Sequence, residues 1–444
     1  MKRTAVVIAV LMLITLAGCR AGPTNKPPDI SDWLEGGLMS APTSEGQRAD
    51  GDSDTSSGQN AGALPSTGRV VVITNRIDED PYTYGEEYTG AEELAARYGE
   101  EQVAHMTWPH WDASADKVAE VLQGVSEDPE VRAVVLTESS TGYTHAIDAL
   151  QYLRDDIFVV YIAARWLDRA YAATVGADLI IQTDMQRFGE LYVAQAISMG
   201  AETIAHYSTP RLDVVPGFAM RRDAMKATTE REGVGFVELV APDYQEGVEM
   251  GDMEMFMVQD MPRQVERLGA NTAFFSEVCY SRVMQIPMVS QTVATGAVFP
   301  SICCLSPYHG YPEAFEVEFQ IPTGETDEYG GPITAWLELP ELLRAIDTAA
   351  DASGAAGRIS SWAVPDGMMW VTIGGMYALE WIGGSVPHER GAIDIEALRR
   401  LASEYAEQIG VDAGATLEPI DLDGETIEHY ILGTVGFHVF GNRR

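Results

Sequence analysis

The chain has 444 residues and a formal net charge of −38, from 67 acidic and 29 basic side chains. A surface this acidic repels the phosphates of DNA and RNA, which argues against nucleic-acid partners. Hydrophobic residues make up 46% of the sequence, as in globular proteins, and a chain of this length favours two lobes or domains.

Residues 1–19 have the layout of a signal peptide. Lys2 and Arg3 precede an apolar run over residues 5–17, which is short for a membrane-spanning helix. The following Leu16-Ala17-Gly18-Cys19 resembles the bacterial lipobox. That resemblance implies cleavage before Cys19 and acyl chains, palmitate among them, that anchor the mature protein to a membrane. An ordinary secretory signal with an incidental cysteine is the alternative.

Residues 20–67 are rich in Pro, Gly, Ser, Asp and Thr and nearly free of aromatic side chains. Such a segment cannot bury enough apolar surface to offset the entropy of ordering it. We therefore expect a disordered tether that holds the folded part away from the membrane.

Residues 68–184 predict a first α/β lobe. Short apolar strands are expected over residues 69–75, 102–108, 131–137, 157–163 and 178–183, with helices over 85–98, 113–125, 143–154 and 170–175 between them. The first strand is a β-branched run, typical of a strand buried on both faces. Strands that alternate with helices indicate a doubly wound parallel sheet.

Residues 185–293 repeat this pattern and predict a second α/β lobe. The expected helices cover 185–200, 217–232, 252–268 and a short segment at 278–284, and the strands cover 203–208, 235–241, 271–276 and 288–293. Residues 294–444 are less regular, with strands at 315–321, 416–420 and 430–440 and helices at 339–352, 368–381 and 395–409. We expect this region to complete both lobes and the hinge between them. Glu380 marks the apolar span 367–384 as a buried helix rather than a membrane crossing.

The order of lipobox, tether and paired lobes resembles type 1 periplasmic binding proteins, including the basic membrane lipoprotein group. Gly296-Ala297-Val298-Phe299-Pro300 and the later stretch from Cys303 to Pro312, CCLSPYHGYP, look like an uncharacterised bacterial lipoprotein family within that superfamily. The resemblance covers about residues 69–330. It implies an α/β fold of two parallel-sheet lobes joined by a hinge, which close on a small solute.

Ligands of open parallel sheets bind beyond the carboxyl ends of the strands, and two facing lobes place these ends along one cleft. The side chains there are polar, aromatic and of mixed charge, which suits a small polar solute. The candidate ligand-binding residues are Asn75, Arg76, Trp108, Glu138, Ser139, Ser140, Arg165, Asp184, Tyr207, Glu277, Tyr280 and His309.

Several of these residues have structural alternatives. Ser139, Ser140 and Asp184 stand where helix caps are common. Arg165 has Asp168 nearby for a surface ion pair of small value. Trp108 can pack within the lobe instead of stacking on a ligand.

Three cysteines remain after Cys19. A disulfide from Cys279 to Cys303 or Cys304 is the favoured interpretation, because adjacent cysteines rarely pair with each other. A ligand-gripping loop or a soft-metal site with His309 are the alternatives, although the spacing matches no common zinc pattern. We predict no cofactor.

None of the common nucleotide, metalloprotease or hydrolase motifs occurs in the sequence. The sequence therefore predicts a non-enzymatic, lipid-anchored, extracytoplasmic solute-binding protein that serves an ABC-type permease or a sensor in the membrane. A hydrolase on the same scaffold, with Glu277 or His309 as acid or base, and a structural surface lipoprotein without ligand are the alternatives.

Overall fold

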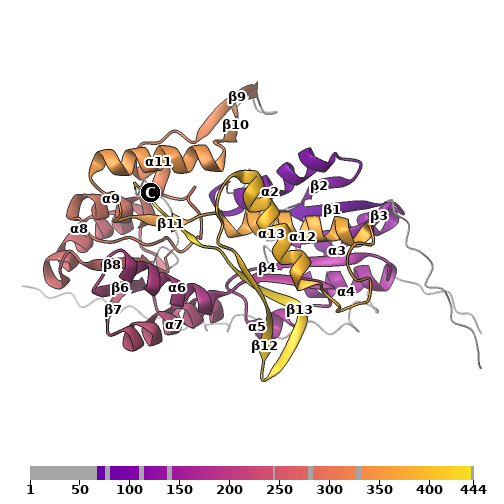
Figure 1. Cartoon of the computed structure of the whole chain (residues 1–444), viewed down its shortest axis with the longest axis horizontal. Helices are drawn as coiled ribbons and strands as arrows, with labels where there is room; N and C mark the ends of the chain where they lie inside the picture. The colour runs from indigo at the N-terminus through magenta and orange to yellow at the C-terminus, as the bar shows by residue number, and fades with distance from the viewer. Residues whose placement is uncertain are drawn as a thin grey trace, which may run out of the picture. The chain divides into compact units, whose positions relative to one another are not determined.

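A computed structural model describes residues 68–75, 81–109, 115–137, 143–243, 246–278, 284–326 and 332–441 (Figure 1). The chain forms two compact units, residues 1–61 and residues 62–444, and all described residues belong to the second unit. The expected signal peptide, Cys19 and tether therefore lie outside the described residues. No helix in the described ranges is long and apolar enough to cross a membrane.

The first lobe is built on a seven-stranded sheet with the order β12-β13-β5-β4-β3-β1-β2. Strands β1 to β5 and β13 run parallel, and only β12 is antiparallel, as the partner of β13 in a hairpin. The strands are β1 (Arg69–Thr74), β2 (Val103–Thr107), β3 (Val131–Thr137), β4 (Phe158–Ala163), β5 (Leu179–Thr183), β12 (Thr416–Leu422) and β13 (Glu425–Thr434).

Helices cover both faces of this sheet, which explains why its strands are apolar throughout. On β1, Val70 and Val72 face one core while Val71 and Ile73 face the other. The first core contains α2 (Pro81–Tyr98), α12 (Asp366–Ile382) and α13 (Ile395–Ile409), and the second contains α3 (Ala115–Glu127), α4 (Tyr143–Leu153) and α5 (Arg169–Ala172). The buried helix expected near residues 368–381 is confirmed as α12.

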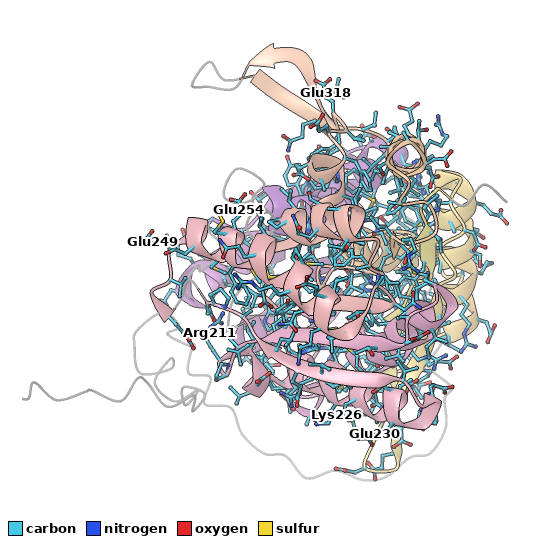
Figure 2. All side chains as sticks on the ribbon, turned by 90° about the vertical axis from the view of Figure 1, so that its left-hand side faces the viewer. Arg211, Lys226, Glu230, Glu249, Glu254 and Glu318 are labelled. Carbon is cyan, nitrogen blue, oxygen red and sulfur yellow. The ribbon has the colours of Figure 1, made fainter. Side chains whose placement is uncertain are left out.

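The second lobe contains a parallel sheet with the order β7-β6-β8, formed by β6 (Thr203–Ser208), β7 (Gly235–Val240) and β8 (Thr272–Ser276). Parallel bridges from Ala273 to Val298 and from Phe299 to Ile359 extend it. The surrounding helices are α6 (Met185–Ser198), η1 (Leu212–Val214), α7 (Pro216–Glu232), α8 (Met250–Leu268), α9 (Ile286–Thr295), α10 (Tyr311–Ala314) and α11 (Leu339–Ser353). Charged side chains such as Glu230, Glu249 and Glu254 point outward here (Figure 2).

Within the described ranges, three segments connect the lobes: residues 183–185, 362–366 and 434–437. The second and third follow β11 (Ser360–Trp362) and precede β14 (Phe437–Val439), which pair antiparallel. The segments are bonded to one another, because the Asp184 amide donates to the Gly433 carbonyl at 2.8 Å and the Ala363 amide donates to the Gly436 carbonyl at 2.9 Å. The expected fold class, two lobes with doubly wound parallel sheets, is confirmed.

Two predicted strands are wrong. Residues 288–293 belong to helix α9, which starts with Pro287 in its first turn and ends at Gly296 in a left-handed cap. A short apolar run does not distinguish a buried strand from a buried helix, and these two end signals were the distinguishing features. Residues 315–321 form a strand only from Gln320, where β9 (Gln320–Thr326) pairs with β10 (Pro332–Trp336). The first part of the predicted strand is not extended, because helix α10 ends at Ala314 and Glu316 has a positive φ of 56°.

Candidate functional site

Five ionisable side chains from both lobes meet between the lobes. Glu86 and Glu87 lie on α2, Arg165 follows β4, Asp366 begins α12, and His309 comes from a loop of the second lobe. His309 Nε2 lies 3.4 Å from Glu86 Oε1, and an Arg165 guanidinium nitrogen lies 3.4 Å from Asp366 Oδ1. The Arg165 charge also acts on Glu86 and Glu87. We call these five residues the interlobe cluster.

Two glycines let α2 and α12 approach closely enough to bring their carboxyl groups together. A Cβ atom at Gly90 would lie 3.0 Å from the Met368 carbonyl oxygen, and one at Gly367 would lie 2.8 Å from the Glu87 carboxyl. Both contacts are tighter than side chains normally allow. The glycines therefore hold Glu87 beside the start of α12.

Asp366 is fixed by neighbours from the first lobe. The Thr183 hydroxyl, at the end of β5, donates to Asp366 Oδ2 at 2.5 Å and accepts from Trp370 Nε1 at 2.9 Å. Asp366 is only 3% exposed. The position of this carboxyl group is thus set by hydrogen bonds that need no ligand.

His309 lies on the loop that follows the added strand at Val298 and Phe299, at the carboxyl end of the second sheet. Leu305 in this loop is buried and has a positive φ of 57°, which is rare and costly for a residue with a branched side chain. Gly310 has a φ of 74°, and a Cβ there would lie 2.9 Å from Gln285 Cβ. A glycine is required at position 310, because any side chain there would clash with Gln285.

Burial shifts the pKa values of the cluster away from their ordinary range. Desolvation, with the Asp366 and Glu87 charges, raises the pKa of Glu86 well above 4.5, and desolvation raises the pKa of Glu87 to about 7. Desolvation and the Arg165 charge lower the pKa of His309 to about 3. Near neutral pH the imidazole is neutral and Glu87 is partly ionised, and the raised pKa of Glu86 favours its protonated form.

Three buried side-chain oxygens of the first lobe have no hydrogen-bond donor in the described part of the chain. Glu86 Oε1 and Glu87 Oε2 are buried without a hydrogen-bond partner in the described part of the chain, and so is Asn75 Oδ1, which directly follows β1. Glu86 is 2% exposed and Asn75 is 4% exposed. Buried polar atoms are normally hydrogen-bonded, so these three acceptors call for an explanation.

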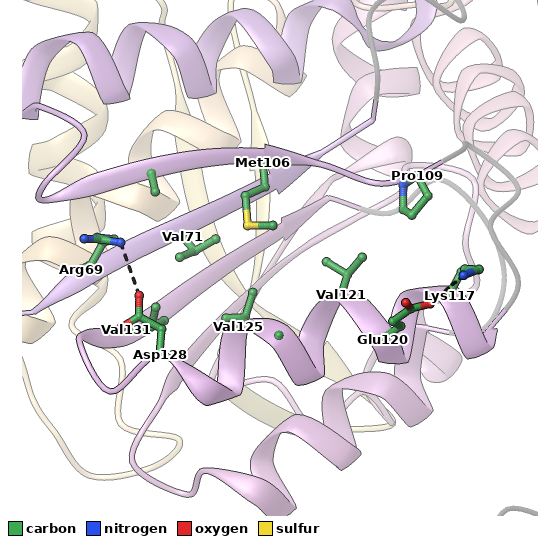
Figure 3. Close-up of a pocket in the computed structure, with 12 residues that line it drawn as sticks. Arg69, Val71, Met106, Pro109, Lys117, Glu120, Val121, Val125, Asp128 and Val131 are labelled. Atoms are coloured by element: carbon green, nitrogen blue, oxygen red, sulfur yellow. Dashed lines mark hydrogen bonds and ion pairs between the residues drawn. The ribbon is translucent and has the colours of Figure 1, made fainter. Parts of the chain in front are cut away.

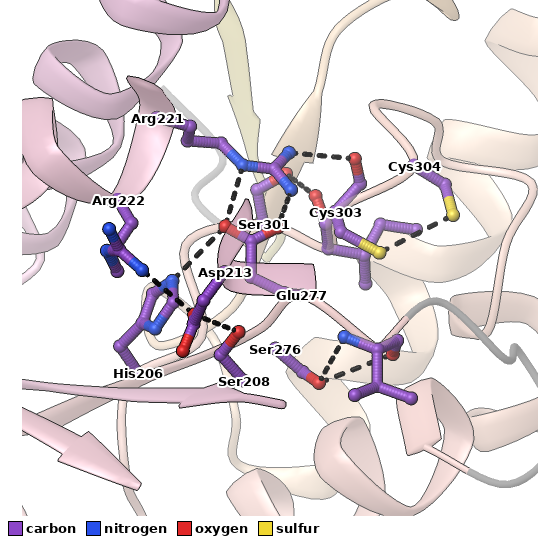
Figure 4. Close-up of polar contacts among 12 residues, drawn as sticks. His206, Ser208, Asp213, Arg221, Arg222, Ser276, Glu277, Ser301, Cys303 and Cys304 are labelled. Carbon is purple, nitrogen blue, oxygen red and sulfur yellow. Dashed lines mark hydrogen bonds and ion pairs between the residues drawn. The ribbon is translucent and has the colours of Figure 1, made fainter. Parts of the chain in front are cut away.

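A second buried charged group comes from the second lobe alone (Figure 4). Arg221 on α7 forms a two-pronged ion pair with Glu277, which follows β8, and Glu277 Oε1 lies 3.2 Å from His206 Nε2. We call these residues the second-lobe triad. Burial alone would raise the pKa of Glu277, but Arg221 and His206 outweigh it and the pKa is lowered. The Arg221 guanidinium also packs on the rings of Phe188, Phe218 and Phe275, at 4.8, 5.2 and 4.8 Å.

Cys303 and Cys304 lie on the same loop as His309, and Cys303 contacts Arg221 of the second-lobe triad. An Arg221 guanidinium nitrogen donates to the Cys303 carbonyl at 3.2 Å, and Gln285 Nε2 donates to the sulfurs of Cys303 and Cys304 at 3.4 and 3.2 Å. Cys303 is a free thiol whose pKa burial raises to about 12, whereas Cys304 is disulfide-bonded. Its partner lies outside the described residues, as does Cys279. The described residues contain no group of three or more His, Cys, Asp or Glu side chains arranged to hold a metal ion.

The structure separates the residues predicted from sequence. Arg165 and His309 belong to the interlobe cluster, Glu277 belongs to the second-lobe triad, and Asn75 ends β1 with an open acceptor. Arg76, Glu138, Ser139, Ser140 and Tyr280 lie outside the described residues.

Three further predicted residues already have protein partners. Trp108 is fully buried, with Nε1 donating to the Thr137 carbonyl at 3.0 Å. The Asp184 carboxylate caps α6 and pairs with Arg169 at 2.5 Å. The Tyr207 hydroxyl donates to Asp260 at 2.8 Å on the α8 side of the sheet.

Sequence reasoning missed Glu86, Glu87, Asp366, Arg221 and His206. It considered only the residues directly after each strand, whereas Glu86 and Glu87 lie more than one helical turn into α2. A carboxyl pair on an inward-facing helix turn was the available signal for these two. The sequence offers no comparable signal for Asp366, because this residue comes from the distant C-terminal region.

A groove of about 500 Å³ lies elsewhere, along the edge strand β2 and helix α3 (Figure 3). Val71, Val121 and Val125 line it, and Met106 on its edge is 42% exposed. The charges at its rim already form the ion pairs Arg69–Asp128 and Lys117–Glu120. The groove therefore offers mainly apolar surface.

A model of the family described as "Protein of unknown function (DUF3798)" matches residues 69–359. Two uncharacterized proteins of Treponema pallidum (strain Nichols) are each 26% identical to the chain, over 177 and 144 residues. These alignments cover 40% and 32% of this chain, and 80% and 63% of the relatives.

The solved structure of a candidate transcriptional regulator from Clostridium difficile 630 has a TM-score of 0.69 at 17% identity, over 85% of this chain and 100% of that one. A periplasmic ribose ABC transporter protein from Conexibacter woesei reaches 0.46 at 13% identity, over 78% and 99%. A solute-binding protein from R. palustris in complex with 4-hydroxybenzoate reaches 0.45 at 14% identity, over 84% and 92%. The first likeness shows a shared fold, and the other two are too distant to support a functional argument.

Proposed function

The chain belongs to the DUF3798 family of proteins of unknown function, and from this premise we propose that it is a lipid-anchored, extracytoplasmic solute-binding protein. Its lobes close on a small polar solute, which it delivers to a permease or reports to a sensor in the same membrane. Closure stabilises the bound state, and no covalent chemistry is involved.

The observation that carries this proposal is the interlobe cluster. A structural contact between lobes is expected to be apolar or fully paired, because a buried polar atom without a partner is destabilising. Glu86 Oε1 and Glu87 Oε2 are buried between the lobes without a hydrogen bond among the described residues. A solute that supplies donors there converts a destabilising contact into a favourable one.

A hydrolase on the same scaffold has one observation in its favour. The Thr74 hydroxyl lies 2.8 Å from His105 Nε2, and His105 Nδ1 contacts Glu92 Oε1, which resembles a hydroxyl–imidazole–carboxylate relay. Thr74 is 0% exposed, however, and its hydroxyl also donates to the Asn75 carbonyl at 3.2 Å. A substrate has no access to this oxygen in the conformation described, so we favour binding.

Thermal unfolding of the full chain in detergent, with a panel of nutrient solutes, tests the binding function. A cognate solute raises Tm in a concentration-dependent way, because it binds the folded chain only, and it is recovered unaltered. Recovery of a converted product would replace the binding function with an enzymatic one. Absence of stabilisation by every solute class would favour a structural lipoprotein.

Mass spectrometry of the mature N-terminus tests the anchor. We expect a chain that begins at a diacylglyceryl-modified Cys19 and partitions with membranes, whereas Cys19→Ser is not lipidated. An unmodified wild-type Cys19 in a freely released protein would refute lipid anchoring.

A further inference from the structure

We propose that the solute bound between the lobes is a small organic cation with N–H donors, such as an amine or a guanidinium compound, held by Glu86 and Glu87. This inference deepens the proposed binding function and rests on it. It names the chemical class of the ligand from the hydrogen-bonding capacity and charge of the cluster.

Two oxygens of the interlobe cluster, and one directly after β1, have no hydrogen-bond partner in the described part of the chain. They are Glu86 Oε1, Glu87 Oε2 and Asn75 Oδ1. The Ser306 hydroxyl of the second lobe already bonds the Glu86 carboxyl, which fixes that side chain toward the opposite lobe. A ligand that matches this site must bring several donors, and ammonium and guanidinium groups carry three and five.

The balance of charge favours the same class of ligand. Three carboxyl groups, those of Glu86, Glu87 and Asp366, share the Arg165 guanidinium, and Arg165 lies closest to Asp366. His309 is neutral at physiological pH, because burial and Arg165 lower its pKa to about 3. A bound anion would face buried carboxyl groups with little compensating charge, whereas a cation supplies the charge that they lack.

A bare metal ion fits less well than an organic cation. The carboxyl groups come from two consecutive residues of α2 and from the start of α12, and the described residues hold no group of metal-ligand geometry. Ammonium and guanidinium groups accept longer and more varied contacts than a metal shell requires.

Proton release on binding is a consequence that only this class of ligand produces. Desolvation raises the pKa of Glu87 to about 7, so this carboxyl of the free site is partly protonated at neutral pH. A cation beside this carboxyl favours its ionised form and expels the proton. Neutral and anionic ligands leave the proton in place or take up another.

The test uses the full chain in detergent with matched probes: putrescine and agmatine as cations, 1,4-butanediol as the neutral analogue, and succinate as the anion. We expect the cations alone to raise Tm. Calorimetric titration at pH 7 in buffers of different ionisation enthalpy should show protons released as putrescine binds. Glu87→Gln should weaken putrescine binding about 10- to 100-fold, as expected for the loss of a charge-assisted hydrogen bond.

Glu93→Gln is the matched control. Glu93 lies on the same helix, and desolvation and Glu338 raise its pKa to about 7, but it is outside the interlobe cluster. This variant should bind putrescine as the wild type does. Because proton release is measured on wild-type protein, the test holds even if Glu87→Gln folds poorly.

The outcomes separate the two proposals. Stabilisation by neutral or anionic solutes, with none by either amine, would overturn the cationic ligand and leave the binding function intact. Amine binding without proton release, or with equal losses in Glu87→Gln and Glu93→Gln, would also overturn it. No stabilisation by any solute would overturn both.

Discussion

The two buried charged groups differ in how completely they are paired. In the second-lobe triad, Glu277 receives two contacts from Arg221 and one from His206, and Arg221 is enclosed by three aromatic rings. In the interlobe cluster, Glu86 and Glu87 each leave a buried oxygen without a donor among the described residues. The Glu277 carboxylate is paired within one lobe and behaves as structure, although His206 Nδ1 of the triad is also buried without a hydrogen-bond partner among the described residues. The carboxyl groups of Glu86 and Glu87 are incompletely paired and behave as a binding site. Burial alone does not distinguish these two roles, but the pairing of the buried carboxyl groups does.

The largest effect should come from breaking the triad. Arg221→Met leaves Glu277 buried without its guanidinium partner, and we expect the free energy of unfolding to fall by about 3–5 kcal/mol. Urea unfolding monitored by circular dichroism measures it. Arg231→Ala is the control on the same helix, since its exposed pair with Glu232 is worth only about 0–1 kcal/mol. Equal losses in the two variants would contradict a structural role for the triad.

A smaller effect should follow from releasing Asp366, the carboxyl of the cluster that Thr183 of the first lobe holds. Thr183→Val removes the hydroxyl that joins Asp366 to Trp370 Nε1, leaving both without this partner. We expect a loss of about 1–3 kcal/mol in the free energy of unfolding, measured in urea. Thr348→Val, whose hydroxyl bonds its own exposed helix turn, should cost less than about 0.5 kcal/mol. If the two valine variants were equally stable, Asp366 would not be held as described.

The smallest effect concerns pH. The pKa of Glu87 is about 7 in the folded chain, against an ordinary value of 4.5. Between these pH values the folded chain holds a proton that the unfolded chain has lost, so this group's contribution to stability is full below pH 4.5 and is lost as the pH rises through 7.

Glu87→Gln cannot ionise, so its free energy of unfolding should fall less than that of the wild type between pH 5 and pH 8. Parallel urea titrations at both pH values measure the difference. Glu101→Gln, which alters an exposed carboxyl in the loop after α2, should retain the wild-type slope. A steeper slope in Glu87→Gln would show that the Glu87 carboxylate is stabilised in the fold.

Much of the fold could be predicted from local sequence patterns, whereas little of the candidate site could be. The β-branched run at residues 69–74 and the regular alternation that follows are local signals, and they correctly indicated parallel α/β lobes. Helix α9 was missed because its short, largely apolar sequence fits either type of element, and only Pro287 and Gly296 favoured a helix. Asp366 and Arg165 are about two hundred residues apart in sequence, and only the three crossing segments bring them together. No local sequence pattern predicts that Asp366 and Arg165 lie close together.

A crystal structure of the full chain grown with putrescine at neutral pH tests the central claim most directly. We predict an amine nitrogen within about 2.7–3.2 Å of Glu86 Oε1 or Glu87 Oε2, between α2 of the first lobe and the His309 loop of the second. Putrescine bound elsewhere, for example along the β2–α3 groove, with both oxygens still lacking a donor, would contradict the assignment of the interlobe cluster as the binding site.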